Sequence, residues 1–144
     1  AAELSREGVH VNLIVDAASS WFTKDVDIVL VGADSVLVDG SVVNKVGTYS
    51  LALAAEENDV PFYAACEKQK FDVRSLLGLK TVLEEKEPSE LLAPGVPSKV
   101  KARNIYFDVT PAKYVTRIVT EDGAIEPSKV RECVEEALEG IYLP

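Results

Sequence analysis

Short, nearly continuous apolar runs that alternate with helix-forming segments constrain the fold of this chain more than any other feature. Four such runs lie at residues 9–15 (VHVNLIV), 27–31 (DIVLV), 61–66 (PFYAAC) and 104–107 (NIYF). Runs rich in Val, Ile and Leu are typical of strands that are covered on both faces of a sheet. Because helices between such strands indicate parallel pairing, we expect an α/β fold with a mostly parallel sheet.

The segments between the runs predict the helices. Residues 17–24 have room for about two helical turns, and residues 47–58 (GTYSLALAAEEN) are apolar almost all round, which indicates a buried helix. Thr110-Pro111 is a helix-start signal. A final helix begins at Pro127-Ser128 and carries its apolar residues on one stripe.

Two turn signals complete the prediction. Asp39-Gly40 stands between residues 35–38 and 41–44, which is a strong signal for a two-residue hairpin turn. Residues 1–6 resemble the last turn of a helix, with Gly8 as its terminating glycine. A domain that starts in the last turn of a helix is expected to be a fragment of a longer protein.

The composition argues against several classes of function. The chain has 15 Lys and Arg against 24 Asp and Glu, which gives a formal net charge of −9. It therefore lacks the basic surface that nucleic acids and anionic membranes require, and we expect neither as a partner. Two cysteines and one histidine argue against a disulfide framework and a zinc site. We expect a cytoplasmic protein without a metal or other cofactor.

Acidic residues follow the apolar runs at the points where parallel strands would end: Asp16, Asp34, Glu67 and Asp108. Ligands of open α/β sheets bind outside the carboxyl ends of the strands, so parallel strands would gather these carboxylates along one edge. The alternative is that several of them cap the helices that follow, which we favour for Asp16. Asp34 differs, because it leads into the hairpin and has no helix to cap.

A second group of candidate residues precedes the helix predicted at 47–58, in the sequence Asn44-Lys45-Val46-Gly47-Thr48. A lysine at the amino end of a helix is unfavourable by about 0.3–1 kcal/mol, and an anion bound to the first amides would reverse that sign. Gly47 allows close backbone approach and Thr48 can cap. A lysine pointing into water explains the pattern equally well. Lys70, after the run at 61–66, either reaches the same edge or is solvated.

Residues 32–71 (GADSVLVDGSVVNKVGTYSLALAAEENDVPFYAACEKQKF) resemble the translation initiation factor 2B alpha/beta/delta family, which includes ribose-1,5-bisphosphate isomerase and methylthioribose-1-phosphate isomerase. Residues 105–127 (IYFDVTPAKYVTRIVTEDGAIEP) are similar to the family's FDVTPP…ITE.G.I.P block, and residues 3–18 to the helix, glycine and strand that open this half. The resemblance implies a Rossmann-like three-layer sandwich. It covers residues 1–144 as one domain, the carboxyl-terminal half of a full-length member, without the helical amino-terminal domain.

Within the family, GAD followed ten residues later by Asn-Lys is similar to the isomerases, whereas the beta and delta subunits generally lose that Asp or the Asn-Lys pair. The resemblance implies that Asp34 is the acid of the isomerisation and that Asn44, Lys45 and Lys70 hold the sugar phosphate. Chemistry of this kind requires a general acid, which a partly desolvated carboxyl at the strand tips would supply.

The family's catalytic cysteine belongs to a segment that would precede Ala1, and neither Cys66 nor Cys133 matches it. Both cysteines are expected to be small core residues, because nothing basic is placed to activate either thiol. This chain alone is therefore expected to bind a phosphorylated pentose without isomerising it.

The function that these residues favour is that of a substrate-binding domain in a sugar-phosphate aldose–ketose isomerase, converting ribose 1,5-bisphosphate to ribulose 1,5-bisphosphate. The alternative is a non-catalytic regulatory subunit that acts through protein partners. A magnesium phosphohydrolase using the clustered carboxylates is a third interpretation. We also expect a homo-oligomer, a dimer or hexamer, with the hairpin at 36–43 and the tail at 141–143 as contact surfaces.

Overall fold

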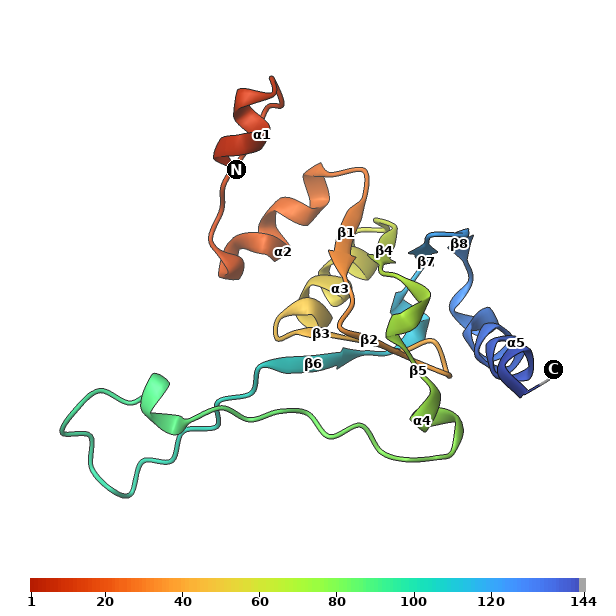
Figure 1. The fold of residues 1–144 in the computed structure, drawn as a ribbon. Coiled ribbons are helices and arrows are strands. Elements are labelled where there is room, and N and C mark those ends of the chain that lie inside the picture. The colour runs from red at the N-terminus through yellow and green to blue at the C-terminus, as the bar shows by residue number, and fades with distance from the viewer. Residues whose placement is uncertain (143–144) are drawn as a thin grey trace.

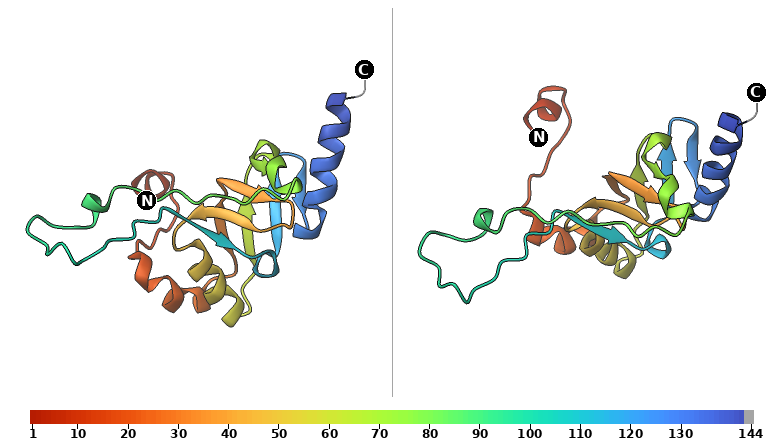
Figure 2. Two further views of the ribbon diagram at one scale, coloured as in Figure 1. Left: turned by 90° about the horizontal axis from the view of Figure 1, so that it is seen from below. Right: turned by 60° about the horizontal axis from the view of Figure 1, so that its bottom comes forward.

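The computed structural model describes the backbone of residues 1–142 and the side chains of residues 1–139, and it has the predicted α/β fold (Figure 1). The helices are α1 (Ala2–Arg6), α2 (Ser19–Phe22), α3 (Thr48–Glu57), α4 (Val73–Leu76) and α5 (Val130–Tyr142). The strands are β1 (Val29–Gly32), β2 (Ser35–Leu37), β3 (Val42–Lys45), β4 (Phe62–Ala65), β5 (Phe71–Asp72), β6 (Phe107–Thr110), β7 (Arg117–Thr120) and β8 (Gly123–Ile125). α2 and α3 lie on one side of the strands, and α4 and α5 lie toward the other (Figure 2).

The first sheet, in the order β1-β4-β7-β8, holds the centre of the core. β1 and β4, from the runs at 27–31 and 61–66, are parallel as predicted. β7 is parallel to β4, and β8 returns antiparallel to β7. Val29 pairs with Phe62, and Ala64 pairs with Ile118. Phe62 and Ile118 are fully buried, because helices or the second sheet cover the inner parts of these strands.

The second sheet has the order β5-β2-β3-β6, and its pairs are antiparallel except for β2 with β5. β2 and β3 form the predicted hairpin. The Leu37 amide donates to the Ser41 carbonyl, so the turn holds three residues, 38–40, and not the two that Asp39-Gly40 predicts. Gly40 adopts a φ of +84°, and its amide donates to the Leu37 carbonyl (2.8 Å). A Cβ at Gly40 would lie 2.5 Å from the Pro127 carbonyl oxygen. The turn is therefore packed tightly against the segment that leads into α5.

The hairpin is part of the core rather than a contact surface. Val36, Val38, Val42 and Val43 are all buried within the chain, so the prediction that residues 36–43 expose an apolar patch is wrong. Val36, Val38 and Val42 belong to the same buried cluster as Phe71 and residues of the first sheet. The predicted tail surface at 141–143 lies outside the side chains that the structure describes.

α3 and α5 confirm the sequence signals, with small residues where packing is closest. α3 coincides with the helix predicted at 47–58, and its Ala52 and Ala55 are fully buried. α5 follows Pro127 and buries Val130 and Val134 against the core. Residues 17–24 form α2 flanked by 3-10 turns. The helix predicted to start at Thr110-Pro111 is absent, because Thr110 ends β6 and only the 3-10 turn Ala112–Tyr114 follows. None of the helices in the described part of the chain is both long and apolar enough to cross a membrane.

The apolar run at residues 9–15 forms no strand, which corrects the prediction. Its side chains are exposed, with Leu13 at 85% and Val15 at 72%. β1 is the edge of the first sheet, and its Leu30 is also 62% exposed. An apolar run forms a buried strand only where neighbouring elements cover it, and among the described residues none covers this one.

The strand predicted at 104–107 is also shifted and reversed. β6 begins at Phe107 and pairs antiparallel with β3 in the second sheet. Residues 77–106, here called the arm, connect α4 to β6; the chain runs alongside β6 and then extends away from the sheets before it returns (Figure 1, Figure 2). An isolated bridge between Glu85 and Ile105 joins the two sides of the arm near its base.

Candidate functional site

One end of the second sheet gathers the four residues predicted to form the site. The amide of Asp34, just before β2, donates to the Val43 carbonyl in β3 (2.9 Å). Asn44 and Lys45 are the last two residues of β3. Lys70 directly precedes β5, which pairs in parallel with β2. β1 and β4 of the first sheet also end just before Asp34 and Lys70, so both sheets contribute to this edge.

The turn from β3 into α3 is held by side chains of the predicted site segment, Asn44 to Thr48. The Asn44 side-chain amide donates to the Thr48 hydroxyl (3.1 Å), and that hydroxyl donates to the Lys45 carbonyl (2.6 Å). Gly47 has a φ of +105°, a left-handed conformation that glycine adopts without strain. These contacts fix the path of the backbone from β3 into α3 and the orientation of the Asn44 side chain.

Asp108, on β6, occupies the amino end of α3. Its carboxylate accepts hydrogen bonds from the Gly47 amide (2.7 Å) and the Tyr49 amide (3.2 Å). The register explains the contact, because Asp108 pairs with Asn44 and directly opposite residues share one face of a sheet. The sequence predicts Asp108 at a strand end or as the cap of a following helix. The structure corrects this: Asp108 lies within a strand and caps a helix that precedes it.

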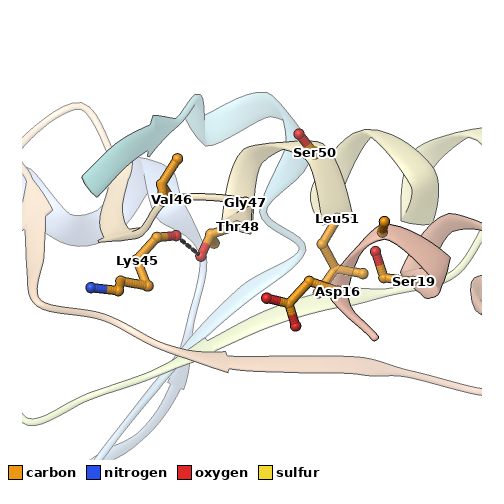
Figure 3. A pocket seen from close by; sticks show the side chains of 9 residues that line it. Asp16, Ser19, Lys45, Val46, Gly47, Thr48, Ser50 and Leu51 are labelled. Carbon is orange, nitrogen blue, oxygen red and sulfur yellow. Dashed lines mark hydrogen bonds between the residues drawn. The ribbon is translucent and has the colours of Figure 1, made fainter. Parts of the chain in front are cut away.

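A pocket of about 470 Å³ opens beside this helix end (Figure 3). Asp16 and Ser19 line it on one side, and Lys45, Thr48 and Ser50 line it on the other. The Asp16 side chain makes no capping hydrogen bond to the 3-10 turn that it begins, so the capping role favoured for it is wrong. Its carboxylate instead points into the pocket (Figure 3). Asp34 and Lys70 are not among the pocket's lining residues.

The ammonium group of Lys45 rests on aromatic rings. Its Nζ lies 3.8 Å from the centroid of the Tyr106 ring and 5.8 Å from that of Phe107. The Tyr106 hydroxyl donates to the Glu90 carboxylate (2.6 Å), and this hydrogen bond lowers the pKa of Glu90. The described ion pairs do not include Lys45. Lys45 is thus positioned by cation–π contacts and remains able to bind an anion.

The other candidate groups are more exposed. Asp34 and Lys70 are solvent-exposed, so the described residues do not supply the desolvation expected for Asp34. Cys66 is half-buried, and burial, with the nearby Glu121 carboxylate, raises the pKa of its thiol. This agrees with the prediction that Cys66 is no activated nucleophile. Cys133 is also a half-buried free thiol.

The four strand-end carboxylates do not gather as predicted. Because β6 is antiparallel to β3, Asp108 turns toward α3, while Asp16 lines the pocket and Glu67 lies beyond β4. Within the described residues, no three His, Cys, Asp or Glu side chains are grouped closely enough to hold a metal ion. The expectation of a single carboxylate cluster is therefore wrong, since it assumed four parallel strands.

Sequence and structure comparisons identify proteins of one family. The profile of the Initiation factor 2 subunit family matches residues 1–127. The ribose 1,5-bisphosphate isomerase of Archaeoglobus fulgidus is 43% identical over 141 residues, which cover 94% of this chain and 44% of that protein. The chain thus spans less than half the length of the curated relatives it matches.

Solved structures give the same result. The translation initiation factor eIF-2B of Pyrococcus horikoshii is 41% identical with a TM-score of 0.72, and the match covers 89% of this chain and 44% of that one. The 5-methylthioribose 1-phosphate isomerase of the same organism is 35% identical with a TM-score of 0.77, covering 94% of this chain and 40% of that one. The likeness therefore extends through the whole fold described above.

Proposed function

The chain belongs to the Initiation factor 2 subunit family, and we propose that it is the carboxyl-terminal, substrate-binding domain of a sugar-phosphate aldose–ketose isomerase. The substrate that we assign is ribose 1,5-bisphosphate, converted to ribulose 1,5-bisphosphate. In this proposal residues 1–144 form one domain, and the remaining parts of the active site lie outside it. The similarity to proteins named as isomerases supports this class of reaction.

The observation that carries the proposal is the convergence of Asp34, Asn44, Lys45 and Lys70 on one end of the second sheet. Three different segments supply them, and strand pairing aligns those segments. A carboxylate, an amide and two ammonium groups are the side chains that a phosphorylated sugar requires. The pocket beside Lys45 offers further polar groups from Asp16, Ser19 and Thr48.

The reaction assigns each residue a role. An aldose–ketose isomerisation moves hydrogen between C1 and C2, and it needs an acid–base pair at those carbons. Because phosphate blocks the C1 oxygen of ribose 1,5-bisphosphate, the ring must first open, and Asp34 donates the proton for that step. Lys45 and Lys70 each bind phosphate oxygens with charge-assisted hydrogen bonds. Asn44 binds the sugar phosphate through the amide that also contacts Thr48.

A titration of this chain with ribose 1,5-bisphosphate, monitored by backbone amide NMR, tests the proposal. We expect weak, salt-sensitive binding that shifts the amides of Lys45 and Thr48 first, because they line the pocket at the charged end of the site. Lys45→Ala should weaken binding, whereas Lys80→Ala removes an exposed lysine outside the site and should have little effect. We expect no measurable isomerisation, since catalysis needs groups positioned from both sides of the substrate.

Other outcomes would contradict this assignment. If the amides at residues 45–48 do not shift while Asp16 and Glu67 respond to magnesium, the magnesium phosphohydrolase is favoured instead. If methylthioribose 1-phosphate binds more tightly than ribose 1,5-bisphosphate, the substrate assignment is wrong although the isomerase class stands. Failure to bind either sugar phosphate would favour the regulatory subunit.

We also propose that the chain forms a homo-oligomer, either a dimer or a hexamer. Many large apolar side chains are exposed, among them Leu13, Leu30 and Val82, and such surfaces are often covered by another chain. Light scattering at high concentration measures the mass directly. A clean 15.6 kDa monomer would contradict the proposal.

A further inference from the structure

The amino end of α3 already holds an anion that belongs to the chain itself. The Asp108 carboxylate accepts from the amides of Gly47 (2.7 Å) and Tyr49 (3.2 Å). The intervening amide of Thr48 and that of Ser50 donate no hydrogen bond within the described residues. Both Thr48 and Ser50 line the pocket. The helix end is thus divided between a part satisfied by Asp108 and a part that faces the pocket.

We propose that Asp108 is a positioning and specificity-determining residue of the anion site, an inference that rests on the proposed function. Its two hydrogen bonds hold the turn between Lys45 and α3 in place. Its negative charge repels a phosphate from the helix axis, so a phosphate binds on the Lys45 side of the pocket alone.

The charge of Asp108 determines how strongly the amino end of α3 attracts a phosphate. The amino end of a helix carries a partial positive charge of about half an elementary charge, and the full negative charge of Asp108 more than offsets it. A single free phosphate therefore gains little from the helix end and depends on Lys45. A ligand with a second phosphate could also reach Lys70, which precedes β5 and is separated from β3 by β2 in the second sheet. Asp108 consequently weakens phosphate binding at the helix end and makes it depend on Lys45.

The test compares Asp108→Asn with the wild-type chain, using inorganic phosphate as the probe. The variant keeps an acceptor oxygen near the amides but removes the charge. We expect it to bind phosphate about three- to tenfold more tightly at low salt, and the difference should shrink at high salt because screening weakens both charges. A residue that only maintained the fold would not tighten binding when it is changed.

Asp72→Asn is the matched control. Asp72 also caps a helix, accepting from the Arg74 amide (2.9 Å) at the start of α4. This substitution removes the same charge and likewise keeps an acceptor oxygen near the capped amide, and it leaves the turn at α3 intact. Phosphate affinity should stay within about twofold of the wild type. A gain equal to that of Asp108→Asn would show that net charge alone is responsible, which would overturn the proposal.

A measurement on the unchanged chain keeps the proposal testable even if Asp108→Asn does not fold. In amide hydrogen exchange, Gly47 and Tyr49 should be protected, and Thr48 and Ser50 should exchange faster. Equal rates at Tyr49 and Thr48 would overturn the inference, as would phosphate affinity that is equal, or absent, in wild type and Asp108→Asn. The ribose 1,5-bisphosphate titration is independent of both results, so it identifies a failure of the proposed function separately.

Discussion

Replacing Gly40 by alanine should destabilise the hairpin that carries the site. Gly40 has a φ of +84°, a conformation that residues with a Cβ rarely adopt. The new Cβ would also lie 2.5 Å from the carbonyl oxygen and 2.6 Å from the Cβ of Pro127. These neighbours belong to the backbone and a rigid ring, so neither can rotate away. Either the turn or the start of α5 must therefore move.

Backbone strain and the close contact with Pro127 both lower the free energy of unfolding of Gly40→Ala. A left-handed backbone conformation costs about 1–2 kcal/mol for a residue with a Cβ, and overpacking costs about 1–3 kcal/mol. Gly40→Ala should therefore lower the free energy of unfolding by about 2–5 kcal/mol. Because the hairpin ends at Asn44 and Lys45, any movement of the turn is transmitted along β3 toward the site.

Gly123→Ala separates the two effects. Gly123 has a φ of +117°, but a Cβ there would meet nothing within 4 Å, so only the backbone cost of about 1–2 kcal/mol applies. Urea unfolding of the two variants and the wild type, followed by circular dichroism, gives the comparison. If Gly40→Ala costs no more than Gly123→Ala, within about 0.5 kcal/mol, the tight contact with Pro127 does not determine the stability of the turn.

Three further predictions concern the hydrophobic core, the Asp72 carboxyl and the Cys66 thiol. Phe62→Ala should lower the free energy of unfolding by about 3–5 kcal/mol, since Phe62 is fully buried; a loss below about 1.5 kcal/mol in urea unfolding would contradict this. Hydrogen bonds from Arg74 lower the pKa of Asp72, so its stabilising effect is present above the unfolded-state pKa and is lost as the pH falls through the folded-state value. Asp72→Asn should accordingly melt below the wild type at pH 7 and nearly with it in acid, and a difference in Tm that is independent of pH would refute the reasoning. In a Cys133→Ser variant, Cys66 is the thiol that remains. Because burial raises the pKa of this thiol, a chromogenic disulfide should react with it more slowly than with glutathione at pH 8. An equal rate would argue against burial.

Local signals in the sequence predicted the parts of the fold that depend on local physics. Asp39-Gly40 predicted the hairpin, although not the length of its turn, because Gly40 readily adopts the positive φ that the turn needs. The helix-forming residues of 47–58 predicted α3. The run at residues 9–15 misled because apolar composition indicates a preference for burial and not which element will cover it. Leu13 and Val15 have the composition of a buried strand without the neighbours that such a strand needs.

In the site too, the sequence predicted the residues that local signals mark but not those that tertiary contacts position. Asp34, Asn44 and Lys45 were identified from a short stretch of sequence, and the hairpin brings their segments together. The role of Asp108 was missed because it depends on a contact with Gly47, 61 positions away in the chain. That contact follows from antiparallel pairing between β3 and β6. The apolar run at 104–107 gives no signal for the direction of pairing, so the register had to come from the structure.

The arm at residues 77–106 has a consequence for how the molecule can be divided. A protease that cuts within the arm would leave one fragment with β1 to β5 and another with β6 to β8 and α5. The pairs β3–β6 and β4–β7 cross that division, so the two fragments would remain associated without a covalent link. Two separately expressed halves should therefore complement one another. Asn44 lies on one half and Asp108 on the other, so the α3 cap would form only in the reassembled protein.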